Sequence, residues 1–407
     1  MLLEVIKTNV CIIGAGPSGA TTSLFLSKMN IQHTIVDAHS FPRDKVCGDA
    51  LDLKVMRVLN HLDPTLVERE IISDDNFIKS KGCRIILSDK KSKDIIVHDK
   101  SLSYPFFFVA KRSYFDNFLA KKIPSSFADF KQGTKVKSIT RVNGIWQISV
   151  EDENREYTIE ANMLVGADGD HSVVLRTVGN RKVVREHYAG ALRQYWKGIS
   201  GIDSNQLLEI YLPKSLPLAY LWIFPLPNGE ANVGCGLASN MIAKKSIDLK
   251  KVFHHLITED PALAQRFKNA KPMEKAVGWG LPLASQHRKA SGDGYLLVGD
   301  AAALVCPTTG EGIGPGMMSG YIAANYIKRA IEQNKYDESI FKNYDREIIK
   351  RMKSDIKKYN FIRNLSPYLY NQLINVLSKL NVSEMYINKK MKDWIKTAKE
   401  KPIVIDF

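Results

Sequence analysis

The chain has 407 residues, with 58 lysines and arginines against 43 aspartates and glutamates, which gives a formal net charge of +15. Its 44% hydrophobic and 25% charged residues are ordinary for a globular protein and exclude a fibrous or disordered chain. The length allows two or three domains with a large core. The sequence contains no run of eighteen apolar residues, so we expect no membrane-spanning helix.

The cysteines form no CxxC pair and no cluster with histidine, so we expect no metal site. Their odd number and apolar settings favour reduced thiols in a cytoplasmic protein. The first predicted strand begins within ten residues of Met1, so we expect no cleavable signal segment. The five cysteines are Cys11, Cys47, Cys83, Cys235 and Cys306.

Residues 10–19 predict a buried strand that runs into a glycine-rich turn and a helix. Gly14 permits the tight turn, Gly16 lets the backbone approach a pyrophosphate, and Gly19 lets the helix pack on the strand. A second strand ends about twenty residues later at Asp37, whose carboxylate is placed to accept hydrogen bonds from ribose hydroxyls. Together these features are typical of a dinucleotide site at a helix N-terminus.

Short alternating runs in 77–110 predict strands, and a helix is expected to open near Ser113 and stop before Pro124. Asn143-Gly144 predicts a hairpin turn between two of the strands that follow. These later strands are expected at 134–139, 146–150, 156–160 and 163–166.

Asp168 follows the last of these strands, in the turn Gly166-Ala167-Asp168-Gly169-Asp170-His171-Ser172. It has two interpretations: a site near the pyrophosphate, or an N-cap of the next helix. The sequence leaves both open, although the nearby nucleotide motif favours the first.

Residues 183–275 predict a second domain, with strands at 207–212 and 230–237 and a helix near 249–257. The chain then returns to the first domain through a buried strand that ends at Gly299-Asp300. Burying a carboxylate without partners is energetically costly. We therefore expect ribose or ribitol hydroxyls to bind the Asp300 carboxylate. Asp37 and Asp300 lie near opposite ends of the chain, and a nucleotide that is held by both is predicted to be FAD.

A glycine-rich loop from Pro307 to Gly314 comes next and feeds a helix that is expected to end near Gln333. Backbone N–H groups at this helix start are suited to stabilise negative charge on the pyrimidine ring of a reduced flavin. From Tyr336 onward the pattern is helical and rich in lysine.

The elements therefore predict an α/β fold with a discontinuous, Rossmann-like FAD-binding domain, an α+β second domain with a β-sheet, and a C-terminal helical region. The FAD-binding domain is expected at 1–75, 105–180 and 276–330, the substrate-binding domain at 76–104 and 181–275, and the helical region at 331–407.

The order of these motifs resembles that of FAD-dependent oxidoreductases of the aromatic hydroxylase type. Two more segments are similar to motifs of the geranylgeranyl reductase family, and the resemblance covers about residues 8–325. The stretch from Pro42 to Gly48 matches that family's P-x-x-K-x-C-G segment, and the stretch from Tyr220 to Pro225 matches its YxWxFP motif. The chain departs from the family pattern at Asp49, where many relatives carry glycine, and at Gly314-Pro315-Gly316.

The resemblance implies a non-covalent FAD and an apolar or lipid substrate whose isoprenoid double bonds are reduced. It places Arg112 on FAD and Val136 beside the adenine. Tyr220, Trp222 and Phe224 either line an apolar tunnel for the substrate or form ordinary sheet core. The expected cofactor-binding residues are Gly14, Ala15, Gly16, Pro17, Ser18, Gly19, Asp37, Ala38, Arg43, Cys47, Gly48, Arg112, Val136, Asp168, Gly299, Asp300, Pro307, Gly310, Gly312 and Ile313.

Cys47 is the candidate catalytic residue, and it has two interpretations. Its thiol donates a proton beside the flavin, or it is a small, polarizable side chain that, with Gly48, allows close packing on the ring.

The predicted reaction passes a hydride from reduced FAD to one carbon of a double bond, while a side chain or water protonates the other carbon. NADPH or NADH is expected as the electron donor, and ferredoxin stays open. The alternative function is a monooxygenase or halogenase that uses a flavin hydroperoxide, although the halogenase WxWxIP segment is absent. A flavoprotein that only carries electrons is disfavoured because the chain lacks cysteine pairs for a redox relay.

The net positive charge indicates either a solvated lysine-rich surface or attraction to anionic lipid, and no nucleic-acid motif accompanies it. We expect peripheral membrane contact through the C-terminal region. The basic residues there are Lys350, Arg351, Lys353, Lys357, Lys358, Lys389, Lys390 and Lys392.

Overall fold

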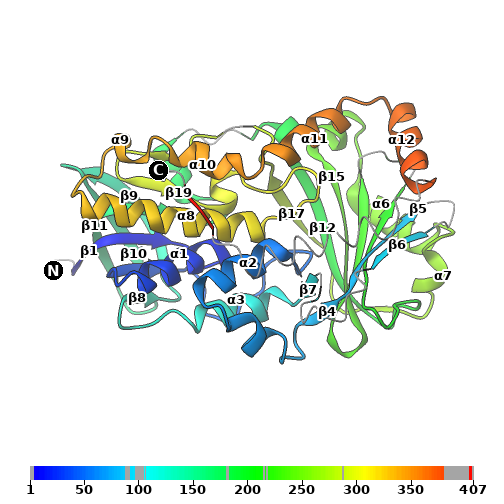
Figure 1. Ribbon diagram of the computed structural model, residues 1–407, viewed down its shortest axis with the longest axis horizontal. Coiled ribbons are helices and arrows are strands. Elements are labelled where there is room, and N and C mark those ends of the chain that lie inside the picture. The colour runs from blue at the N-terminus through cyan, green and yellow to red at the C-terminus, as the bar shows by residue number, and fades with distance from the viewer. Residues whose placement is uncertain are drawn as a thin grey trace.

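Two eight-stranded β-sheets in the described part of the chain form two lobes that lie side by side (Figure 1). The computed structural model describes residues 4–87, 92–96, 105, 107–179, 183–213, 216, 219–286, 288–379 and 403–405. The first sheet is parallel at its centre and the second is mostly antiparallel, which confirms the predicted combination of an α/β and an α+β lobe.

The first sheet brings the ends of its central strands to one edge. Ile13 ends level with Val36 on one side and Gly166 on the other, and Gly166 is level with Leu297. The parallel strands, in spatial order, are β19 (Tyr295–Leu297), β11 (Glu156–Gly166), β1 (Val5–Ile13), β2 (His33–Val36) and β8 (Ala128–Lys131). The antiparallel additions are β18 (Ser291–Gly292), β10 (Ile145–Glu151) and β9 (Lys135–Val142). Ligands bind at such an edge in open α/β sheets.

Helices α1 (Pro17–Lys28) and α8 (Ile313–Glu332) approach each other closely through glycines. A Cβ atom at Gly316 would lie 2.5 Å from Ser18 Oγ, and one at Gly320 would lie 2.4 Å from the Ser18 carbonyl oxygen. The run 314–316 therefore belongs to the first turn of α8, where small residues allow contact with α1. Helices α2 (Leu53–Leu62), α3 (Arg112–Ala120) and α4 (Val173–Val178) complete this lobe.

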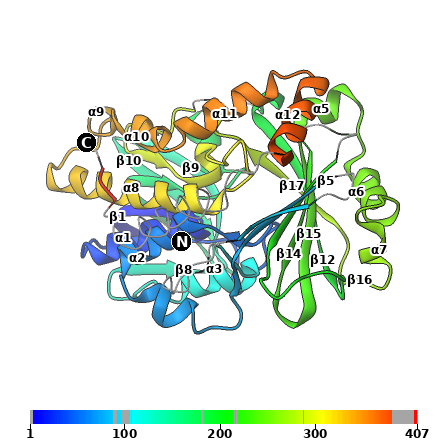
Figure 2. The ribbon, with the colours of Figure 1, turned by 45° about the vertical axis from the view of Figure 1, so that its right-hand side comes forward.

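The second sheet is covered on one side by helices α6 (Leu249–Thr258) and α7 (Ala264–Phe267), which share a buried apolar cluster with its strands (Figure 2). Its strands, in spatial order, are β16 (Lys271–Pro272), β12 (Tyr188–Lys197), β15 (Glu230–Ala238), β14 (Tyr220–Pro225), β13 (Leu208–Leu212), β5 (Gly82–Leu87) and β6 (Ser92–Ile96). Strand β17 (Val277–Pro282) also pairs with β12, and α5 (Ser239–Lys244) follows β15.

Three details differ from the sequence predictions. The two strands expected at 156–160 and 163–166 are one continuous strand, β11, because residues 156–161 pair with β10 and the overlapping residues 158–166 pair with β1. Strand β17 lies beyond residue 275 but belongs to the second sheet, so the expected boundary at 275/276 cuts that sheet. A separate small sheet contains β3 (Ala50–Leu51), β7 (Phe107–Val109) and β4 (Ile78–Ser80).

The described part of the C-terminal region is helical, as predicted. It contains α9 (Glu338–Phe341), α10 (Tyr344–Lys350), α11 (Lys353–Arg363) and α12 (Pro367–Lys379). Helix α11 runs from the first lobe toward the second, and α12 lies beside the second lobe (Figures 1 and 2). Lys389, Lys390 and Lys392 lie outside the described residues. Within the described segments, no helix combines the length and apolar character needed to cross a bilayer.

Candidate active site

A cavity of about 1240 Å³ lies between the carboxyl edge of the first sheet and the face of the second sheet. Sites for one drug-sized ligand are commonly about 300–1,000 Å³, so this cavity has room for more than one such molecule. The glycine-rich turn after β1 lines one part of it, and strands β12, β14 and β17 line another.

The N-terminus of α1 opens into the cavity and has the properties of an anion site. Gly16 is its N-cap, no side chain caps it, and no acidic residue lies in its first turn. Gly14 has a φ of +96°, and a Cβ atom there would lie 2.4 Å from the Ala167 carbonyl oxygen. A Cβ atom at Gly16 would meet only Arg43, at 3.5 Å, so this is where another molecule can approach the backbone.

Two carboxylates flank this turn. Asp37 follows β2 and accepts hydrogen bonds from the backbone N–H of Ala15 at 2.7 Å and of His39 at 2.9 Å. Asp168 accepts from the N–H groups of Val173 and Val174, at 2.6 and 3.2 Å, so it helps to cap α4. Its second oxygen, Oδ1, is buried without a hydrogen-bond partner, and burial raises the pKa of the group. Both interpretations of Asp168 are thus compatible with its position.

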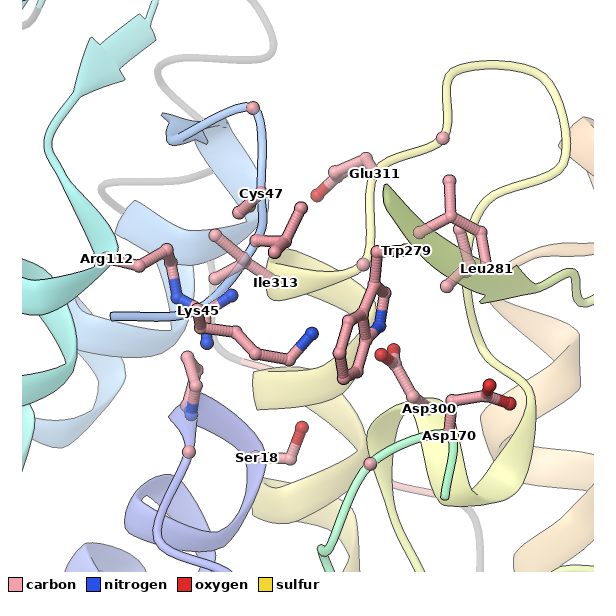
Figure 3. A pocket seen from close by; sticks show the side chains of 18 of the residues that line it. Ser18, Lys45, Cys47, Arg112, Asp170, Trp279, Leu281, Asp300, Glu311 and Ile313 are labelled. Carbon is pink, nitrogen blue, oxygen red and sulfur yellow. The ribbon is translucent and has the colours of Figure 1, made fainter. Parts of the chain in front are cut away.

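Asp300 enters the cavity from the far segment of the chain, in a short 3₁₀ helix (Gly299–Ala302) after β19. Burial raises its pKa, while Lys45 and Arg112 act in the opposite direction. The Lys45 ammonium lies 3.4 Å from the centre of the Trp279 ring, and burial lowers its pKa to about 8 (Figure 3). This part of the cavity therefore holds partly desolvated charges of both signs.

Cys47 lies beside Arg112 on the same side of the cavity (Figure 3). Burial raises the pKa of its thiol, and the Arg112 guanidinium partly offsets this effect. Arg112 itself donates to both oxygens of Asp116, at 2.6 and 2.8 Å, and Arg43 donates to the same carboxylate at 2.9 Å. Two cations thus share one buried carboxylate, which leaves net positive charge beside the nucleotide turn.

The aromatic residues of β14 face the loop that carries Cys47. Ring centres of Tyr220 and Trp222 are 5.8 Å apart, and those of Trp222 and Phe224 are 6.3 Å apart. A Cβ atom at Gly48 would lie 3.4 Å from Phe224 and 3.6 Å from the Trp222 indole nitrogen. All three aromatic side chains line the cavity, so they form an apolar wall there and also pack within the lobe.

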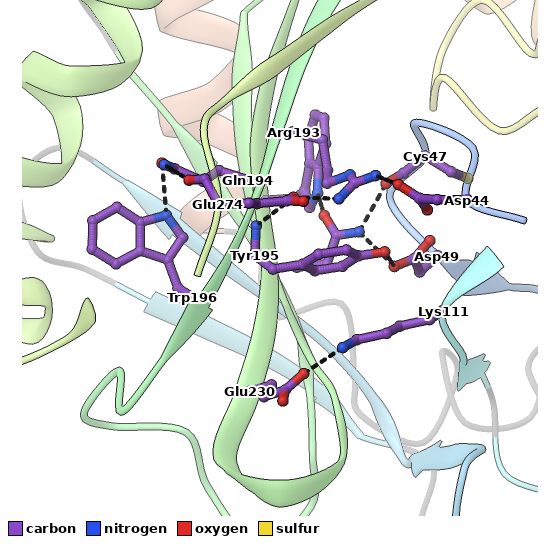
Figure 4. A network of polar contacts seen from close by, with 12 residues as sticks. Asp44, Cys47, Asp49, Lys111, Arg193, Gln194, Tyr195, Trp196, Glu230 and Glu274 are labelled. Carbon is purple, nitrogen blue, oxygen red and sulfur yellow. Dashed lines mark hydrogen bonds and ion pairs between the residues drawn. The ribbon is translucent and has the colours of Figure 1, made fainter. Parts of the chain in front are cut away.

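A network of polar contacts joins the Cys47 loop to the second sheet (Figure 4). Asn232 accepts from Trp222 Nε1 and donates to the Cys47 carbonyl oxygen and to Asp49, all at 2.8 Å. Tyr195 also donates to Asp49, at 2.8 Å. Asp49 has a φ of +66°, a conformation that favours glycine, which accounts for the glycine expected there in relatives. These hydrogen bonds help to hold an aspartate in that backbone conformation.

An acidic cluster around Glu311 lines the cavity on the side that carries Cys47 (Figure 3). Lys54 Nζ lies 2.6 Å from Glu311 Oε2 and 3.5 Å from Asp52 Oδ2. Asp52 is the N-cap of α2 and accepts from the N–H groups of Lys54 and Val55. Glu311 precedes α8, and its Oε1 atom is buried without a hydrogen-bond partner. Burial raises the pKa of Glu311 to about 8, with the neighbouring Asp52 carboxylate acting in the same direction.

Most of the residues predicted from the sequence come together around this cavity. Those that line it are Gly14, Gly16, Pro17, Ser18, Asp37, Ala38, Arg43, Cys47, Gly48, Arg112, Val136, Asp168, Tyr220, Trp222, Phe224, Asp300, Gly310, Gly312 and Ile313.

Four predicted cofactor-binding residues do not line the cavity: Ala15, Gly19, Gly299 and Pro307. Gly19 is buried against Gly14, because a Cβ atom there would lie 1.9 Å from the Gly14 carbonyl oxygen. Gly299, with a φ of +59°, donates its N–H to Ser319 at 3.0 Å and so supports the turn from behind. Gly19 and Gly299 therefore support the turns around the cavity without lining it.

Several lining residues were not predicted as site residues: Lys45, Asp52, Lys54, Trp279 and Glu311. Lys45 is the lysine of the P-x-x-K-x-C-G segment, and Glu311 lies in the predicted glycine-rich loop, so a sequence signal existed for both. Nothing in the sequence placed Trp279 or Lys54 near them, since only the second sheet and the start of α2 bring these residues to the cavity.

Comparison with known proteins agrees with this geometry. Residues 7–211 match the family of FAD-binding domains, and residues 190–279 match the geranylgeranyl reductase catalytic domain. A digeranylgeranylglycerophospholipid reductase of Methanococcus vannielii is 28% identical, over 93% of this chain and 88% of that protein. The Methanocaldococcus jannaschii protein of the same name is 29% identical, over 83% of this chain and 81% of its own length.

Solved structures share the fold. A geranylgeranyl bacteriochlorophyll reductase-like protein from Thermoplasma acidophilum gives a TM-score of 0.78 at 24% identity, covering 96% of this chain and 100% of the other. A flavin-dependent brominase gives a TM-score of 0.73 at 18% identity, covering 95% of this chain and 99% of the other. Likeness at these identities shows the architecture alone, and it includes enzymes with different chemistry.

Proposed function

The chain belongs to the FAD-binding domain family and is an FAD-dependent oxidoreductase of the geranylgeranyl reductase type, and we propose that it saturates the isoprenoid chains of a glycerophospholipid. The observation that carries this proposal is the apolar wall of β14, which lies beside the Cys47 loop and lines a cavity large enough for two ligands. The names of the similar archaeal proteins support this substrate class.

The residues around the glycine turn fit FAD. The uncapped start of α1 offers backbone N–H groups to the pyrophosphate, and Arg43 supplies positive charge beside it. Asp37 would hold the ribose, and ribitol or ribose hydroxyls would be the partners of the buried Asp300 carboxylate. Reduced FAD, when bound, would supply the hydride for the reaction.

The chain's own part in the reaction is to orient an apolar substrate and to exclude water. Tyr220, Trp222 and Phe224 would hold the isoprenoid chain on the second sheet, and Gly48 leaves space between them and the ring. Cys47 lies where either proposed role is open to it: a proton donor, or a small group that permits close packing. Its raised pKa keeps the thiol protonated at neutral pH, which both roles allow.

The proposal is tested anaerobically with purified, flavin-loaded protein that has been reduced chemically. Addition of a digeranylgeranyl glycerophospholipid is expected to reoxidise the flavin, and mass spectrometry should find two added hydrogens for each double bond reduced. The fully saturated lipid is the matched control and should leave the flavin reduced. If no polyprenyl lipid reoxidises the flavin, the reductase proposal is wrong; oxygen-dependent formation of a hydroxylated or halogenated product would support the alternative chemistry.

The electron donor stays a prediction. NADPH and NADH are each expected to bleach the flavin of the oxidised protein under anaerobic conditions, and reduction by ferredoxin alone would contradict this expectation. Absorbance at the flavin band measures it directly.

We also propose that helices α11 and α12 contact an anionic membrane surface from which the lipid is taken. Phe361 and Leu369 are exposed on these helices, and Lys357 and Lys358 are exposed beside them. Ser354 and Lys358 also line the cavity, so this surface lies at its rim. Flotation of the protein with anionic vesicles at low salt, and loss of this flotation at high salt, would support the proposal. Vesicle binding that does not depend on the anionic lipid content would contradict it.

A further inference from the structure

We propose that Glu311 is the acid that protonates the substrate double bond, with Lys54 and Asp52 setting its proton affinity. This inference rests on the proposed reductase function, which requires a proton as well as a hydride. It assigns the proton to a residue on the loop before α8 and leaves Cys47 a packing role.

The position of Glu311 fits this task. Its side chain reaches from the loop into the cavity on the side that carries Cys47 and Ile313 (Figure 3). Its Oε2 atom is held by Lys54 at 2.6 Å, whereas its buried Oε1 atom lies beside the Asp52 carboxylate, where only a bound proton can make a hydrogen bond. A buried carboxyl oxygen without a partner is costly unless a ligand or a proton occupies it.

Small residues make room for this carboxyl group. A Cβ atom at Gly314 would lie 2.2 Å from Glu311 Oε1 and 2.9 Å from Asp52 Oδ1. Gly314 therefore allows both carboxyl groups to lie beside the first turn of α8. The run at 314–316, which departs from the family pattern, thus has a local function in this chain.

The charges of the cluster favour one bound proton. With both carboxylates ionised and Lys54 protonated, the cluster carries one net negative charge in a buried place; with Glu311 protonated, it is neutral. Burial and the Asp52 carboxylate raise the pKa of Glu311 and Lys54 opposes the shift, with a net pKa of about 8. Burial lowers the pKa of Lys54, but Glu311 and Asp52 outweigh burial and the net direction is upward. A general acid works best when its pKa lies near the working pH.

Other titratable groups near the cluster come from several elements. Cys306 lies on the same loop, Tyr220 lies on β14, and Cys47 lies on its own loop. Asp355 and Lys358 of α11 lie at the rim of the cavity.

The step balances as follows. One carbon of the double bond gains a hydride from the reduced flavin, which ends oxidised by two electrons. The other carbon forms its C–H bond with the proton of Glu311, whose O–H bond breaks and leaves a carboxylate. Lys54 stabilises that carboxylate, and because 43% of the Lys54 side chain is exposed, solvent can return a proton through this side of the cluster.

The test uses the flavin-loaded enzyme, reduced anaerobically and mixed once with substrate at a series of pH values. In the wild type the rate of flavin reoxidation is expected to fall as pH rises through about 8, because Glu311 loses its proton there. E311Q should be slower by about a hundredfold or more and should lose this decline. The control is E338Q, since Glu338 also lies 2.6 Å from a lysine but is exposed, and it should behave as the wild type.

Two substitutions beside Glu311 should shift the pH at which the rate of flavin reoxidation falls, one to lower pH and the other to higher pH. D52N keeps a good helix N-cap but removes the like charge, so the decline should move to lower pH. K54M removes the opposite charge, so the decline should move to higher pH. A merely structural role for the cluster predicts no such opposed shifts.

A readout independent of turnover is the infrared carboxylic-acid C=O band of the oxidised, flavin-loaded protein. This band should disappear on titration through about pH 8 in the wild type and should be missing in E311Q. If wild-type protein reduces the lipid but E311Q keeps its rate and pH profile, this inference is wrong while the proposed function stands. If instead C47S alone abolishes the decline, the proton comes from Cys47. Failure of the wild type with every polyprenyl lipid would overturn the proposed function itself.

Discussion

The two ends of the cavity are built in different ways. At the first sheet, the nucleotide turn is made mainly of backbone, with Gly14, Gly16 and Asp37 within one continuous stretch of chain. At the second sheet, the wall is made of side chains, and Trp222 reaches its neighbours on the Cys47 loop through Asn232. Backbone geometry tolerates little change in sequence, whereas a side-chain wall can be altered to suit another substrate.

The shared fold supports this contrast. The brominase at 18% identity has the same architecture over 95% of this chain, so one scaffold serves enzymes of different chemistry. We therefore expect substitutions at the first end to abolish cofactor binding and folding, and substitutions at the second end to change substrate handling and stability by smaller amounts.

The largest effect is expected at Gly19. In G19A the new Cβ atom would lie 1.9 Å from the Gly14 carbonyl oxygen, so the turn must distort, at a cost of about 3 kcal/mol or more. G16A is the matched variant: its Cβ atom meets only Arg43, at 3.5 Å, so it should fold normally and yet bind FAD at least about tenfold more weakly. Thermal unfolding and FAD titration measure the two effects; wild-type FAD affinity in G16A would show that the pyrophosphate lies elsewhere.

A smaller effect is expected at Trp222. W222F removes the 2.8 Å hydrogen bond to Asn232 and should cost about 1–2 kcal/mol of unfolding free energy, because the Asn232 oxygen is left unpaired in the interior. W279F is the comparison, since the Trp279 indole nitrogen has no hydrogen-bond partner, and its loss should be smaller. Denaturant unfolding measures both. W222F should also raise KM for the polyprenyl lipid while FAD affinity stays unchanged, and a fall in FAD affinity would contradict the separation of the two ends.

The smallest effect concerns the pH dependence of stability. Burial raises the pKa of Asp49 from 3.8 to about 6, so the folded protein binds this proton more tightly than the unfolded chain does. That contribution to the stability of the folded protein is fully present below pH 3.8 and is lost as pH rises to about 6. D49N keeps an acceptor for Tyr195 and Asn232 but does not titrate, so it should gain stability relative to the wild type over this range. Unfolding midpoints of the wild type and of D49N are measured at pH 4 and pH 7. If the midpoint changes by the same amount in both proteins between these pH values, Asp49 does not titrate in this way.

The nucleotide end could be predicted from the sequence because its signals are local. Gly14, Gly16 and Asp37 act through turn geometry and strand ends that lie within thirty residues of each other, and the structure places all three at the cavity. The far contribution of Asp300 was also predicted, because a carboxylate that ends an apolar strand needs a partner. Gly19 packs against Gly14, the role that the sequence also predicted for it, and Gly299 donates its N–H to Ser319 behind the turn.

The sequence by itself determined the class of fold and the FAD motif, which follow from local periodicity and spacing, and the family resemblance, which rests on matching motif residues. Only the tertiary structure decided which side chains from distant parts of the chain meet. Lys54 and Glu311 are 257 residues apart in the chain but 2.6 Å apart in space, and Trp279 covers Lys45 only because β17 joins the second sheet. Local rules fix backbone shape, whereas burial and mutual charge, which set the pKa of Glu311, exist only in the folded tertiary structure.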